Sequence, residues 1–372
     1  TYYADYDELA ERRVQGELTA EEEEAALLEL EDRELPRHYH HLGWRDVMDI
    51  NVWWRQLSEP RDLVLWIDRL PLAQQGTQLG LSTHLLSGMF KNHRYYPYHD
   101  MGVRVVGRTM YERGYFFHAE NYDMRVPLTQ AQRKQALAAR SVGELYAAAG
   151  GIGVSILAPC NSIKYPGKVL NGTRILAKKG EKEGWDLTIS TPCTMTRYAE
   201  FEQELEYVMD ELILPNLTEY LRLSRRLERM DHSDPERAEL AVAVQQYKEN
   251  VMKGGLMFFF YWVHFAPLSR GTSATGYAVM VAFFLSVGES MVDPVPKLKQ
   301  LDFEGMFRAS PHAFVDTVFP WMENRRATPI PTAYLDNHKG HRLSDIFGTT
   351  RKMMSLFVSQ PGTDGYNRKY TF

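Results

Sequence analysis

One stretch of the chain constrains the fold more than any other, because it places a polar loop between two strongly apolar runs. The apolar runs cover 256–263 and 278–287, and the polar loop covers 267–273. Backbone amides and hydroxyls that are buried without partners cost about 1–3 kcal/mol each. We therefore expect two buried segments, the second one a helix, joined by a loop that is hydrogen-bonded either within the chain or to a ligand.

The loop also carries the groups that bind anions at the start of a helix. Its residues Ser269, Arg270, Gly271, Thr272 and Ser273 are small or polar. The free amides and the positive dipole end of a helix N-terminus attract anions, and a guanidinium binds phosphate or carboxylate through two parallel hydrogen bonds. The alternative is that Thr272 or Ser273 only caps the helix and that Arg270 forms an internal salt bridge.

Composition and charge narrow the class of protein. Of the 372 residues, 44% are apolar and 24% are charged, which is typical of a globular protein with a substantial core. The formal net charge of −5 argues against a nucleic-acid surface. Polar residues interrupt the apolar runs before the ~20 residues that a membrane span needs, and no signal-peptide pattern opens the chain. Because Cys160 and Cys193 are too few for a disulfide framework, we predict a cytoplasmic protein.

Turn signals and hydrophobic periodicity predict an α+β fold that is mainly helical. Residues 1–40 are expected to form acidic, solvated helices, and 41–372 a single unit. Short β-type runs separated by glycine-containing turns predict a three-stranded antiparallel meander at about 154–194. Helices are expected at 82–91, at 130–149, at 196–229 with a break near Pro215, and at 238–253 leading into the apolar stretch.

Polar residues gather where the predicted strands end. The set is Asn161, Thr173, Arg174, Thr191, Thr194 and Arg197. Segments at a sheet edge commonly carry binding residues. We therefore predict that Asn161, Arg174, Thr194 and Arg197 form a second wall of the ligand site.

Cysteines and histidines give weaker signals. Cys160 and Cys193 follow predicted strands, and they are either buried, inert thiols or a nucleophile with a redox partner. The segment 38–41 contains three histidines, but no carboxylate or cysteine stands near it at the spacing of a zinc site on a helix. No metal site is predicted.

Five blocks of sequence resemble one known family. They are WRQLSEPRDLVLWID at 54–68, CNS at 160–162, GKVLNGTR at 167–174, DLTISTPCT at 186–194 and PLSRGT at 267–272. In this order and spacing they resemble the C-terminal, non-repeat region of the family that contains the animal tetratricopeptide-repeat protein thirteen and a related plant immune-suppressor protein. This chain has no tetratricopeptide pattern at 34-residue spacing. Those proteins are known as regulators, so the resemblance implies no established reaction.

The central stretch is also similar to the helix–loop–helix core of the Fic and AvrB-like superfamily. In Fic proteins a His-Pro-Phe loop holds nucleotide phosphates at the start of the second helix, and its histidine is the general base. Here the order is His264-Phe-Ala-Pro, and Ser269-Arg-Gly-Thr stands where those proteins have Gly-Asn-Gly-Arg. The acidic metal-binding position is absent. The resemblance implies a Fic/AvrB-like core in which His264 acts on an acceptor and Arg270 on phosphates.

Together these patterns predict a group-transfer enzyme, with a nucleotide or nucleotide-sugar donor and a hydroxyl or amine acceptor. His264 and Arg270 would be catalytic, with Ser269, Gly271, Thr272 and Ser273 on the phosphates. One alternative is a tailoring enzyme that acts on an amino acid or peptide. The other is a non-catalytic regulatory module that binds a peptide or metabolite. All three predicted functions involve a small-molecule or peptide partner, and none involves a nucleic acid or a membrane.

Overall fold

The computed structural model describes residues 43–58, 64–67, 83–85, 96–180, 184–192, 195–289 and 295–323, with three isolated residues nearer the N-terminus. The chain divides into two compact units, 1–47 and 48–372, and the elements below lie in the second, except that the helix Trp44–Ser58 begins in the first. The expected acidic helices of 1–40 lie almost entirely outside the described residues. The mainly helical α+β class is confirmed.

The apolar stretch forms the centre of the helical part. Helix α11 (Arg237–Phe265) is buried continuously from Phe258 to Phe265, and α12 (Thr272–Ser286) packs against it. A Cβ atom at Gly276 would lie 2.3 Å from Trp262 Cδ1, so glycine permits the close approach of α12 to α11. The expected helix over 238–253 and the apolar segment after it are thus one helix. The Fic/AvrB-like identity of this helix–loop–helix stays a prediction.

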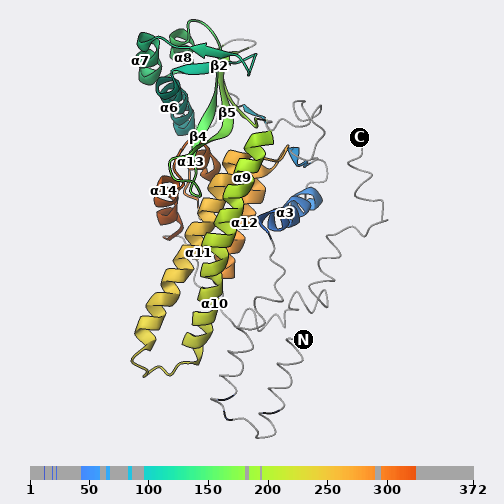
Figure 1. The fold of residues 1–372 in the computed structure, drawn as a ribbon, viewed down its shortest axis with the longest axis vertical. Coiled ribbons are helices and arrows are strands. Elements are labelled where there is room, and N and C mark those ends of the chain that lie inside the picture. The colour runs from blue at the N-terminus through green and yellow to red at the C-terminus, as the bar shows by residue number, and fades with distance from the viewer. Residues whose placement is uncertain are drawn as a thin grey trace, which may run out of the picture. The chain divides into compact units, whose positions relative to one another are not determined.

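A second long helical segment lies beside α11. It consists of α9 (Met195–Tyr207), the π-helical segment η3 (Val208–Ile213) and α10 (Leu214–Arg229). In Figure 1, α10 runs alongside α11 as the other arm of a hairpin. Pro215 stands in the first turn of α10, directly after the π-helical segment, and it has no amide hydrogen to donate to the preceding turn. The expected break near Pro215 is therefore a change of helix type just before it.

The sheet has six strands in the order β1-β6-β5-β4-β2-β3, and every neighbouring pair is antiparallel. The strands are β1 (Thr83–Leu85), β2 (Tyr115–His118), β3 (Arg125–Pro127), β4 (Val154–Asn161), β5 (Val169–Lys179) and β6 (Trp185–Ser190). Strands β4, β5 and β6 confirm the predicted meander. The helix expected at 82–91 is wrong at its start, because 83–85 pair with β6.

The remaining helices have between 6 and 18 residues. They are α3 (Trp44–Ser58), α6 (Tyr96–Arg113), α7 (Gln130–Ala138), α8 (Val142–Ala148), α13 (Leu301–Met306) and α14 (Pro311–Glu323). Figure 1 shows α6, α7 and α8 grouped near β2, and α13 and α14 next to α11. The helix expected at 130–149 is two helices, because Ser141 caps α8 after a break at Ala139. No helix in the described ranges is both long and apolar enough to cross a membrane.

Candidate functional site

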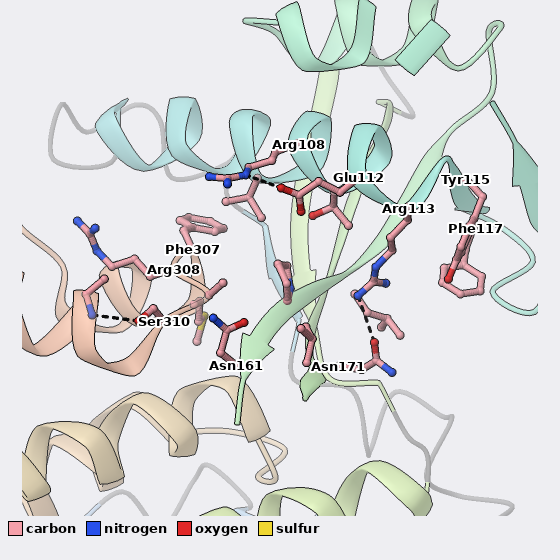
Figure 2. Close-up of a pocket in the computed structure, with 18 of the residues that line it drawn as sticks. Arg108, Glu112, Arg113, Tyr115, Phe117, Asn161, Asn171, Phe307, Arg308 and Ser310 are labelled. Atoms are coloured by element: carbon pink, nitrogen blue, oxygen red, sulfur yellow. Dashed lines mark hydrogen bonds and ion pairs between the residues drawn. The ribbon is translucent and has the colours of Figure 1, made fainter. Parts of the chain in front are cut away.

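A cavity of about 910 Å³ lies between α6, one face of the sheet and the turn that joins α13 to α14 (Figure 2). Cross-strand partners share a face of a sheet. Pro159 pairs with Asn171 and Asn161 pairs with Val169, and all four side chains line the cavity. The pairing register shifts between Leu157 and Pro159, where Gly172 and Thr173 of β5 stand opposite one residue of β4, so the bulge lies on β5.

Four arginines line the cavity, and two of them are neutralised by carboxylates. Arg108 Nε lies 2.8 Å from Glu112 Oε1 on the same helix. Arg308 Nη2 lies 2.8 Å from Oε2 of the buried Glu304. Among the described residues no carboxylate forms an ion pair with the other two, Arg113 and Arg125.

Arg113 is half-buried at the C-terminus of α6. Its Nη2 donates to Asn171 Oδ1 at 3.3 Å, and Figure 2 shows its side chain reaching across the cavity toward Asn171. Burial lowers the pKa of Arg113, and the nearby charge of Arg125 lowers it further, while Tyr115 and Glu112 act in the opposite direction. The negative dipole end of α6 favours a cation here without any carboxylate partner.

Arg125 is exposed on β3 and stacks on two aromatic rings. Its guanidinium carbon lies 5.0 Å from the Tyr115 ring centroid and 5.8 Å from that of Phe117. The two rings are one residue apart on β2, so they share a face of the sheet. Stacking restricts the rotamers of Arg125 and leaves the guanidinium hydrogens available to a ligand.

Asn161 is the sequence-predicted residue that lines this cavity. Its backbone nitrogen donates to Ala309 O at 2.7 Å, and its carbonyl accepts from Tyr261 Oη at 2.8 Å. Burial raises the pKa of Tyr261, which keeps that hydroxyl a donor. These bonds fix the end of β4 to α11 and to the turn after α13.

His264 lies behind the sheet, fully buried at the end of α11. Its Nε2 lies 3.0 Å from Arg308 O, so Nε2 carries the hydrogen and Nδ1 a lone pair. Nδ1 has no hydrogen-bond partner among the described residues. Burial lowers the pKa of His264 to about 4, and the carbonyls of Arg308 and Gly305 partly offset this. His264 thus supports the turn that carries Arg308, and its catalytic role stays a prediction.

Gly172 on β5 is the residue that faces Nδ1 of His264. A Cβ atom there would lie 2.3 Å from Nδ1 and 2.9 Å from Ala158 O. We expect Gly172→Ala to lower the free energy of unfolding by about 1–3 kcal/mol, because overpacking forces buried neighbours to shift. The measurement is urea unfolding. Lys179→Ala, exposed on the same strand, is the control and should stay within about 0.5 kcal/mol of the wild type; an equal effect of both would contradict the packing argument.

Arg197 is 2% exposed and joins α9 to the end of α11. Its Nε donates to Asn171 O at 2.8 Å, and its Nη2 donates to Phe265 O at 2.6 Å and to the carbonyl of His264. Backbone carbonyls at the end of a helix favour a cation. The structure therefore brings Arg197 and His264 together behind the cavity.

The loop 267–273 is in part paired within the chain. Ser269 N donates to Leu65 O at 2.8 Å, and Ser269 Oγ accepts from Leu65 N at 2.9 Å. Ile67 N donates to Pro267 O at 2.8 Å. Of the two possibilities for this loop, internal hydrogen bonding accounts for 267–269.

The start of α12 differs from the expected cap. Gly271, at a φ of 75°, occupies the N-cap position, and neither Thr272 nor Ser273 makes a capping bond. Ser273 Oγ instead donates to Asp302 Oδ2 at 2.8 Å, and Thr272 Oγ1 is buried without a partner among the described residues. Arg270 is exposed. None of the residues 270–273 lines the 910 Å³ cavity, and their phosphate-binding role stays a prediction.

Of the remaining residues predicted from the sequence, those that the structure describes do not line the cavity. The guanidinium carbon of Arg174 lies 3.8 Å from the ring centroid of Tyr122. Thr194 and Cys193 lie outside the described residues. Cys160 is a buried free thiol whose pKa is raised by burial, which fits the inert interpretation. Arg113 and Arg125 were not predicted to be site residues. The sequence signal for them was a basic residue, Arg113, just before the alternating aromatic residues Tyr115 and Phe117.

The sequence is similar over most of its length to two curated proteins, as the resemblance implied. It is 27% identical over 323 residues to Suppressor of RPS4-RLD 1 of Arabidopsis thaliana, which covers 86% of this chain and 28% of that protein. It is 26% identical over 294 residues to Tetratricopeptide repeat protein 13 of Homo sapiens, which covers 77% of this chain and 31% of that protein. The chain thus matches less than a third of either relative. No family model matches it, and no solved structure does.

Proposed function

We propose that this chain is a regulatory binding module that recognises an anionic ligand in the cavity beside α6. The observation that carries the proposal is that the guanidiniums of Arg113 and Arg125 line the same cavity and form no ion pair with a carboxylate among the described residues. Like charges held together are unfavourable, so an anion that bridges them gains free energy from both.

The cavity surroundings support binding more directly than catalysis. Ligand cavities commonly measure about 300–1,000 Å³, and this one, at about 910 Å³, falls in that range. Its walls come largely from regular elements, α6 and the sheet, which suits recognition. The relative from Arabidopsis thaliana is named a suppressor, which agrees with a regulatory role. A cytoplasmic location belongs to the same proposal, because Cys160 is a free thiol.

Replacing Arg125 tests the proposal. Inorganic phosphate and citrate should raise the Tm of the wild-type protein, whereas sodium chloride at matched ionic strength should not. Arg125→Gln should weaken the affinity at least about tenfold, because it removes one of the two unpaired cations.

The matched control is Arg104→Gln. Arg104 is an exposed arginine on α6 that pairs with Asp100 at 2.6 Å and does not line the cavity. The Arg104→Gln protein should bind phosphate with the affinity of the wild type. Equal weakening by Arg104→Gln, or full binding by Arg125→Gln, would contradict recognition by this pair.

Group transfer from a nucleotide or nucleotide-sugar donor is the second candidate. The observation that favours it is Glu112, a carboxylate in the same cavity wall as Arg113. In that reaction the two arginines would hold the donor phosphates and Glu112 would accept the proton of the acceptor hydroxyl. The acceptor oxygen would bond to the transferred group as the bond from that group to the nucleotide phosphate breaks, and the nucleotide would leave with the electron pair. Donor hydrolysis by the wild type that is lost in Glu112→Gln, with phosphate binding retained, is the result this candidate requires.

A further inference from the structure

A second cavity adjoins the first at the end of β4. This second cavity measures about 400 Å³ and shares Asn161, Val169 and Ser310 with the first. Its other lining residues come from the loop between β4 and β5 and from the start of α14. We call these two adjoining cavities the trough; its lining residues run from Arg113 and Arg125 to those beyond Val169.

The walls of this trough are open to solvent. Arg125, Asn161 and Asn171 are exposed, and Val169 is 53% exposed. Sites for small molecules usually bury about 70–90% of the ligand, and transfer reactions need water to be excluded. An open trough suits a segment of a longer chain that contacts the protein along one side.

The chemical character changes along the trough. One end has the guanidiniums of Arg113 and Arg125, and the other has the apolar side chains of Ile163, Pro166 and Pro311. The cation in the second cavity, Lys168, already pairs with Glu200 at 3.0 Å. The trough therefore complements a ligand that is anionic at one end and apolar at the other.

We infer that the trough binds a phosphorylated peptide segment, an inference that rests on the proposed anion recognition. A phosphoryl group carries a charge of about −1.5 to −2 at neutral pH and three acceptor oxygens, which matches two forked donors better than a single carboxylate does. An apolar side chain of the same peptide occupies the second cavity, next to Val169.

A panel of fluorescein-labelled ten-residue peptides tests this inference. Each peptide has a central phosphoserine and one leucine at a varied distance on either side, and binding is measured by fluorescence anisotropy. The best peptide should bind at least tenfold more tightly than its unphosphorylated form and than inorganic phosphate. Arg125→Gln should remove the dependence on phosphorylation, and Arg104→Gln should leave it intact.

Val169→Ser tests the apolar contact, because Val169 is exposed where the two cavities adjoin. This exposed substitution should weaken the best peptide at least threefold, while competition by inorganic phosphate stays as in the wild type. If phosphate binds but no peptide binds more tightly than phosphate, or if Val169→Ser has no effect, the peptide inference is overturned and anion recognition stands. Tighter binding of a nucleoside diphosphate than of any peptide also overturns it. If no anion binds at all, both proposals fail.

Discussion

Replacing Arg197 with methionine should lower the free energy of unfolding by about 3–5 kcal/mol, the largest loss of stability that we expect from one substitution. The buried guanidinium donates to the carbonyls of Asn171, His264 and Phe265. Hydrogen bonds to a charged group contribute about 1.5–3 kcal/mol each, and carbonyls left buried without partners add a penalty. Methionine keeps the apolar stem against the rings of Phe201 and Phe265, so the loss isolates the hydrogen bonds.

An exposed arginine supplies the control for this experiment. Arg226 pairs with Glu236 at 3.2 Å, and both side chains are exposed. Arg226→Met should cost less than about 1 kcal/mol, because surface ion pairs contribute little. Urea denaturation of the wild type, Arg197→Met and Arg226→Met measures the free energy of unfolding of each protein. If Arg197→Met were as stable as Arg226→Met, the carbonyls would have other donors and Arg197 would not hold α11 to β5.

Local signals in the sequence predicted the meander and the central helices. The turns before β5 and β6 contain glycines, and Gly167 and Gly184 have φ angles of 88° and 85°, which other residues rarely adopt. Strands β1, β2 and β3 were not predicted, because they have only three or four residues and depend on partners elsewhere in the sheet. The pairing of Phe117 with Ser155 is one such contact.

The continuity of α11 is a second case in which tertiary packing decided the outcome. Gly254 and Gly255 stand in its middle, where glycine usually weakens a helix. Close packing at these positions requires glycine, because a Cβ at Gly254 would lie 2.8 Å from Ile213 Cγ1 and one at Gly255 would lie 3.2 Å from the Phe283 side chain. These glycines serve close packing, a role that a single sequence does not distinguish from a helix end.

The candidate site was predicted only in part. Asn161 was expected to bind a ligand and does line the cavity, whereas the loop at Ser269 pairs with Leu65, about two hundred residues earlier. The unpaired state of Arg113 and Arg125 depends on where every nearby carboxylate falls in three dimensions. Glu112, for example, is next to Arg113 in sequence but pairs with Arg108.

Acid should destabilise the protein through His264. The pKa of a histidine in the unfolded chain is about 6.5, and burial lowers that of His264 to about 4 in the folded protein. Between these values the unfolded state binds a proton that the folded state does not, so stability falls as the pH falls from about 6.5 to 4. The total loss is on the order of 3 kcal/mol, and above pH 6.5 His264 contributes no pH dependence.

Urea denaturation at several pH values from 7.5 to 4.5, on the wild type and on His264→Gln, measures this contribution. Glutamine keeps a donor for Arg308 O but does not titrate, so the difference between the two proteins isolates His264 from the carboxylates. Identical slopes would show that the buried imidazole is not the group responsible. Arg197 also lowers the pKa of His264. Arg197→Met should therefore raise the pKa of His264, because the positive charge of Arg197 no longer opposes protonation of the imidazole.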